Sequence, residues 1–145
     1  MLGAIYTIIG QPGLYEMVSS NKNSFIMREL STQKIVLFPL RMKSIRVDDV
    51  LIYTTGEDVS ILKVFQNIFA KEDGKQVEIP SKENTDAFFS YMEKVLPEFD
   101  KERVYANNIR KLLQWYNILV SNGKTNFSVE KKEENTETSK EEENK

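Results

Sequence analysis

The first third of the chain alternates between apolar and polar residues over short stretches. Residues 4–9 are apolar on one face and nearly so on the other, as expected for a strand that is buried on most of both sides. Five short strands joined by tight turns favour a small SH3-like β-barrel over an OB-like barrel, whose strands are usually longer. The expected strands are residues 4–9, 14–20, 24–30, 34–38 and 50–55, with a loop or short helical turn at residues 41–46.

The stretch Gly10-Gln11-Pro12-Gly13 separates the first two expected strands. Pro12 presets φ for the first central position of a β-turn, and Gly13 supplies the positive φ that a type II turn needs next. A phosphate-binding loop also contains glycines, but it requires a following helix and a Lys-Ser/Thr pair that this stretch lacks. We interpret the stretch as a structural turn on which the other strands fold back.

The spacing of apolar residues changes after the fifth expected strand, from a period of two to a period of about 3.6, which indicates helices. A first helical stripe starts at Ile61 and ends near Gly74, a residue typical of helix C-termini. A second helix is expected at about residues 84–96 and a third at about residues 108–120. The pattern therefore predicts an α+β protein.

The composition changes again after the third expected helix. Residues 124–145 carry seven acidic and five basic side chains, and only Phe127 and Val129 are substantially apolar. Such a segment buries too little apolar surface to offset its ordering entropy, so we expect it to be disordered. The predicted organisation is an SH3-like barrel at residues 1–56, a helical domain at residues 57–122 and a disordered charged tail at residues 123–145.

Composition also removes several classes of chemistry. The 145 residues include no histidine and no cysteine. Disulfides, Cys-His or Ser-His-Asp catalysis and the usual zinc sites are therefore excluded. The net charge of −2 selects neither nucleic acid nor membrane as a partner. We predict a protein that is not an enzyme, with no catalytic, metal-binding or cofactor-binding residues and no cofactor.

The N-terminal sequence and the lengths of the apolar runs bear on where the protein is found in the cell. The N-terminus shows no basic region followed by an apolar region, as a secretory signal would. No apolar run approaches the length of about 18 residues that is needed to span a membrane. We expect a cytoplasmic protein with no membrane association.

Arg41, Lys43 and Arg46 form the basic cluster of the strand-rich half. With an aromatic side chain nearby, such a loop is a candidate contact for a nucleic-acid backbone. The competing interpretation is a solvated loop. It is favoured by the adjacent Asp48-Asp49 and by the equal numbers of basic and acidic side chains in residues 1–122.

Trp115, on the third expected helix, is the candidate residue for a protein partner. Trp and Tyr are enriched in interface hot spots, but a small domain also needs its largest aromatic side chains inside. Trp115 and Tyr116 are adjacent and point about 100° apart on a helix, so at least one of them should lie at an edge or against the barrel. Just before this helix, Asp100, Arg103 and Tyr105 are expected to form a buried polar bracket that orients it.

Two motifs, far apart in the chain, stand out together. One is Gly10-Gln11-Pro12-Gly13-Leu14-Tyr15, and the other comprises residues 95–100 (VLPEFD), 103–105 (RVY) and 109–117 (IRKLLQWYN). With Ile52-Tyr53-Thr54 between them, the chain resembles a family of small bacterial proteins of unknown function. The resemblance covers about residues 1–120 and implies a strand-rich N-terminal domain followed by a helical C-terminal domain. It supplies no activity, cofactor or catalytic residue.

We expect a non-catalytic intracellular binding or adaptor protein with a protein partner. Its contact surface would be the loops of the barrel or the seam between barrel and helices. The alternative is an RNA- or DNA-associated factor that binds through Arg41, Lys43 and Arg46, with an affinity that falls steeply with salt. A third hypothesis, an enzyme without His or Cys chemistry, requires a concave pocket with carboxylates or lysines of shifted pKa.

Overall fold

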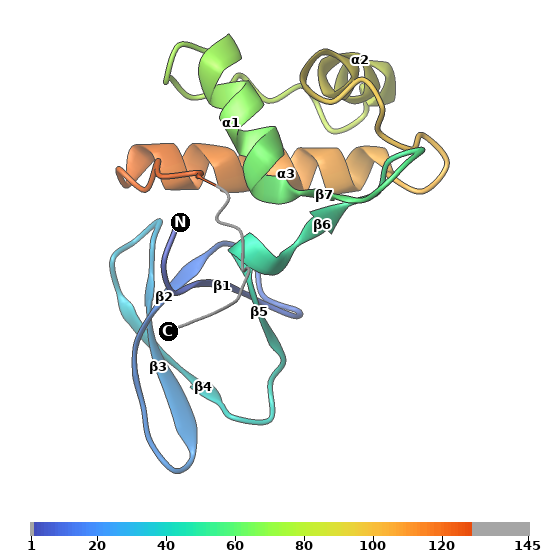
Figure 1. Cartoon of the computed structure of the whole chain (residues 1–145). Coiled ribbons are helices and arrows are strands. Elements are labelled where there is room, and N and C mark those ends of the chain that lie inside the picture. Colours follow the sequence, from blue (N-terminus) through green and yellow to red (C-terminus); the bar gives the residue numbers. More distant parts are fainter. Residues whose placement is uncertain (1, 129–145) are drawn as a thin grey trace, which may run out of the picture.

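The computed structural model describes residues 2–128, in which a strand-rich half precedes a helical half (Figure 1). The strands are β1 (Ile5–Ile8), β2 (Tyr15–Ser20), β3 (Ser24–Glu29), β4 (Ile35–Pro39), β5 (Ser44–Arg46), β6 (Leu51–Ile52) and β7 (Val59–Ser60). The helices are the short 3-10 helix η1 (Val47–Asp49), α1 (Ile61–Lys71), α2 (Thr85–Val95) and α3 (Ala106–Ser121). The predicted α+β class, with three α-helices after the strands, is confirmed.

The first five strands form one antiparallel sheet in the order β4-β3-β2-β1-β5. Within residues 2–128 no pairing joins β4 to β5, so the sheet is open and the predicted closed SH3-like barrel is wrong. Two local features oppose closure. Pro39, at the end of β4, has no N–H to donate to a neighbouring strand, and β5 has only three residues.

The fifth strand of the sheet differs from the predicted one. β5 lies in the stretch expected to be a loop, where Ile45 pairs with Thr7 of β1. Of the expected strand at residues 50–55, only the part at β6 forms a strand. It pairs with β7, which lies immediately before α1. The expected boundary at residue 56 therefore falls inside a hairpin that leads into the helical half.

Side-chain caps fix where the helices begin. Ser60 and Asn84 each accept a hydrogen bond from an N–H group in the first turn of α1 and α2. Before α3, the side-chain oxygen of Asn108 accepts the Tyr105 N–H at 2.9 Å. Among residues 2–128, no helix has the length and apolar character needed to cross a membrane. The cytoplasmic location stays a prediction.

One hydrophobic core joins the two halves. The strand-rich half contributes Leu2, Ile5, Leu14, Leu30 and Val47 to the same cluster that contains Phe65, Met92 and Tyr116 of the helices. A second, smaller cluster within the curved sheet consists of Ile8, Tyr15, Met27 and Phe38. Because the main cluster draws on both halves, each half covers apolar surface of the other.

The segment after α3 packs onto the helices, so the predicted disordered tail does not begin at residue 123. Phe127 is 3% exposed and its ring contacts those of Phe65, Phe69 and Tyr116. Its carbonyl accepts a hydrogen bond from the Gln66 side chain. The remainder of the predicted tail, residues 129–145, lies outside the described residues.

Candidate binding groove

A groove of about 1060 Å³ lies between the sheet and α3. Three segments supply most of its lining: the end of β1 with the turn that follows it, the stretch from β5 to just after β6, and α3 with the loop that precedes it. Most of its lining side chains are apolar, including Ile9, Ile45, Leu51, Tyr53, Leu112, Trp115 and Ile118. The groove therefore lies at the seam between the strand-rich and helical halves.

The turn between β1 and β2 forms the first wall. The Ile8 carbonyl accepts a hydrogen bond from the Gln11 N–H, and Gly10, between the two residues, has a φ of +89°. Gly13 has a φ of +87°, so the positive φ predicted there is confirmed. The Tyr15 hydroxyl donates to the Pro12 carbonyl at 2.8 Å. This bond holds the turn against β2.

One side of α3 forms the second wall. Lys111, Trp115 and Ile118 follow one another at four- and three-residue spacing, which places them on the same side of the helix. Trp115 is half-buried here, whereas Tyr116 is fully buried and donates its hydroxyl to the Lys75 carbonyl at 2.9 Å. The prediction that one of the two adjacent aromatics lies at an edge is confirmed, and that residue is Trp115.

Several exposed apolar side chains lie together in the groove. Ile9, Ile45, Leu51 and Tyr53 are 53%, 40%, 56% and 45% exposed. They are four of the nine exposed large hydrophobic side chains among residues 2–128. Clustered exposure of this kind marks an interaction surface more often than scattered residues do. Sequence reasoning missed these four, because a strand with two apolar faces gives no signal of which side stays uncovered.

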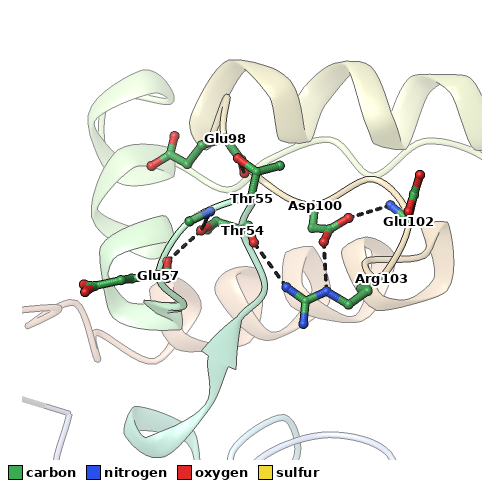
Figure 2. Close-up of polar contacts among 8 residues, drawn as sticks. Thr54, Thr55, Glu57, Glu98, Asp100, Glu102 and Arg103 are labelled. Atoms are coloured by element: carbon green, nitrogen blue, oxygen red, sulfur yellow. Dashed lines mark hydrogen bonds and ion pairs between the residues drawn. The ribbon is translucent and has the colours of Figure 1, made fainter.

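Arg103, which lines the groove, forms part of a polar bracket (Figure 2). Arg103 donates to the Asp100 carboxylate at 2.8 Å and to the Thr54 carbonyl at 3.2 Å. Its guanidinium group also lies over the Tyr53 ring, 4.3 Å from the centroid. The expected bracket therefore joins Asp100 to Arg103, but the Arg103 side chain is 50% exposed rather than buried. Tyr105, 62% exposed, lies outside it at the start of α3.

The charge of Asp100 is stabilised by its neighbours. The hydrogen bond from Arg103 and a second bond from the Glu102 N–H lower the pKa of Asp100 below its ordinary value. The Asp100 carboxylate is therefore ionised at neutral pH, and the pair with Arg103 persists there. The bracket connects the segment after β6 to the loop before α3 (Figure 2).

The basic residues near β5 are not among the lining residues of the groove. Arg46 donates two bonds to the Asp48 carboxylate, at 3.0 and 2.9 Å, so its guanidinium group is engaged within the fold. Arg41 and Lys43 are exposed on the turn before β5 and do not line the groove. Of the four predicted partner-binding residues, Trp115 is the one that lines it.

Charged side chains are few in the groove. Those among its lining residues are Glu29, Arg103 and Lys111. Within residues 2–128, no group of three or more acidic side chains lies close enough together to hold a metal ion. The arrangement therefore offers apolar contact with a few charged groups at its margins.

Two domain families match the chain in sequence. One domain of unknown function, DUF5606, matches residues 2–42, and another, DUF6852, matches residues 50–119. The first match contains β1 to β4, and the second extends from β6 through most of α3. The groove lies where the two matched regions meet.

A solved structure matches both regions together. The solution NMR structure of a structural-genomics target from Bacteroides vulgatus is 38% identical, with a TM-score of 0.72, and the match covers 88% of this chain and 91% of that chain. The chain belongs to the same family as this protein. The resemblance drawn from the motifs is thereby confirmed. Among curated proteins, none matches the chain.

In this DUF5606–DUF6852 protein, the two motifs that carry the family resemblance meet in the groove. Gly10 to Gly13 of the first motif form one wall. Lys111, Leu112 and Trp115 of the second motif form the opposite wall. The sequence features by which the family was recognised therefore lie on two sides of one surface.

Proposed function

We propose that this chain is a non-catalytic binding protein that holds an apolar segment of a partner protein in the groove between the sheet and α3. The observation that carries the proposal is the cluster of exposed apolar side chains at Ile9, Ile45, Leu51 and Tyr53. Covering such side chains with apolar residues of a partner is favourable by about 25 cal/mol per Å² of buried surface.

The size and exposure of the groove support a polypeptide rather than a small molecule. Its volume of about 1060 Å³ lies at the upper end of small-molecule pockets, and its apolar walls are half open to solvent. Trp115 adds a rigid, half-buried aromatic ring of the type enriched in binding hot spots. The shared core positions both walls before a partner arrives.

The nucleic-acid alternative depends on the basic residues outside the groove. Because Arg46 is bonded to Asp48, the exposed cations of that cluster are reduced to Arg41 and Lys43. Two cations on a turn supply little of the phosphate contact that nucleic-acid binding requires. The protein partner therefore ranks first, and salt-dependent binding to RNA or DNA ranks second.

The test compares two variants in capture from a nuclease-treated lysate. Leu51 and Val18 are 56% and 48% exposed, so each tolerates lysine, but only Leu51 lines the groove. We expect the wild type and Val18→Lys to capture the same protein partner and Leu51→Lys to lose it. Equal capture by both variants would refute the groove as the contact surface. Loss of every partner on nuclease treatment would favour nucleic-acid association.

A further inference from the structure

The outer edge of β4 has unpaired backbone groups. β4 is the last strand of the sheet, and within residues 2–128 it pairs with β3 alone. The Lys34 carbonyl accepts a bond from Glu29, the last residue of β3, at 2.9 Å. Because backbone groups in an antiparallel pair alternate in direction, the N–H and C=O groups of Ile35 and Leu37 point away from β3.

This edge has little of the protection that sheet edges usually carry. Apart from the pairing with β3, no hydrogen bond among residues 2–128 involves Ile35 or Leu37. Their side chains are 50% and 59% exposed, and residues 35–40 contain no charged side chain. Exposed apolar edge strands without charges are templates for pairing with another strand.

We propose that two copies of this chain associate through β4, edge to edge and antiparallel, about a two-fold axis at Val36. In this register Ile35 of each copy lies opposite Leu37 of the other, and the two residues exchange N–H···O bonds. Ile35 and Leu37 also share one face of the strand, so their side chains become cross-strand neighbours.

A second copy fits this edge because the edge is complementary to itself. The two-fold axis places the outward N–H groups of Ile35 and Leu37 in one copy against the outward carbonyls of Leu37 and Ile35 in the other copy. Pro39, which lacks an N–H, falls outside these bonds. Gln33, with a φ of +64°, leaves the extended conformation at the other end. The ladder is therefore confined to residues 35–37.

The size of the contact sets its strength. A ladder of three residues buries much less than the roughly 1,600 Å² of a standard stable interface. The dimer should therefore be reversible, with a Kd between about 10 μM and about 1 mM. No residue of β4 lines the groove, so the dimer contact and the proposed partner site are separate surfaces.

Engineered cysteines test the register directly, because the chain contains no cysteine. Ile35→Cys and Leu37→Cys proteins with different tags are mixed and mildly oxidised. We expect a disulfide-linked heterodimer at least several times more abundant than either homodimer, since Ile35 faces Leu37 across the axis. Val18→Cys, exposed on β2, is the control and should form only background homodimer. Linkage no greater than that of Val18→Cys would overturn the proposal.

Sedimentation velocity gives an independent measurement without cysteines. The wild type should shift from monomer to dimer between about 10 μM and about 1 mM. Leu37→Lys, which adds a charge to the edge, should stay monomeric, whereas Leu51→Lys should dimerise like the wild type. A wild type that is monomeric throughout would refute the dimer. Because the two variants alter different surfaces, failure of the dimer leaves partner capture through the groove unaffected, and the reverse also holds.

Discussion

Replacing Phe127 by alanine should destabilise the whole fold, although the residue lies beyond the last helix. Its ring is 3% exposed, with centroids 5.4 Å from Phe65, 6.0 Å from Phe69 and 6.2 Å from Tyr116. Truncating a buried Phe to Ala typically costs about 3–5 kcal/mol of unfolding free energy. Because Phe127 packs onto the helices from a short segment after α3, we expect the lower end of this range, about 3 kcal/mol.

Urea unfolding followed by fluorescence of the single tryptophan measures this effect. With an m-value of about 2 kcal/mol/M, a loss of about 3 kcal/mol lowers the midpoint by about 1.5 M. Val18→Ala, at an exposed position, is the control and should change the free energy by less than about 0.5 kcal/mol. If Phe127→Ala shifted the midpoint no more than Val18→Ala, the conclusion that this segment completes the core would be refuted.

Four further substitutions test the turn, the core and the bracket. Gly10→Ala should cost about 1–2 kcal/mol in urea unfolding, because its added Cβ meets no atom within 4 Å and only the positive φ is penalised. An unchanged midpoint would argue against a left-handed backbone there. Tyr116→Phe should cost about 1–2 kcal/mol, because the Lys75 carbonyl loses its hydroxyl donor, and a neutral result would contradict that bond. The pKa of Asp100 is lowered in the fold by Arg103, so its stabilisation is complete above the unfolded pKa of about 3.9 and is lost as pH falls through the lower folded value. Asp100→Asn should remove this part of the acid sensitivity. If the melting temperature of the variant still fell below about pH 4 in the same way as that of the wild type, the assignment would be contradicted. Arg103→Ala should lower the melting temperature at neutral pH, and an unchanged value would show that the bracket does not stabilise the fold.

Features set by local sequence were predictable. The expected third helix at residues 108–120 corresponds to α3 at Ala106–Ser121, because a stripe at helical spacing needs no information from elsewhere in the chain. The turn after β1 was predictable because Gly permits a positive φ and Pro fixes φ through its ring, but its hydrogen bond joins Gln11 to Ile8 and so is not centred on Pro12 and Gly13. The edge position of one of the two aromatics Trp115 and Tyr116 was predictable by geometry, since adjacent residues on a helix cannot share one narrow face, but which of the two lies there was not.

Features set by contacts between distant segments were not predictable. Phe127 stands alone among polar residues, and its burial depends on rings of α1 and α3 that only the fold brings together. Closure of the sheet depends on whether β4 pairs with β5, and β5 itself lies in a stretch that the sequence pattern predicted to be a loop. The groove residues Ile9 and Leu51 resemble core residues in sequence, and they are exposed because no element within residues 2–128 covers them.

The proposal that the groove holds a partner segment is tested most directly by site-specific photo-cross-linking. A photoreactive phenylalanine derivative is placed at Leu51 in the groove and, as the control, at Val18 on the sheet. The protein should form an adduct with one partner protein from position 51 and none from position 18, and Trp115→Ala should weaken the adduct from position 51. Equal adducts from both positions, or an adduct from position 51 that Trp115→Ala leaves unchanged, would contradict the groove as the binding site.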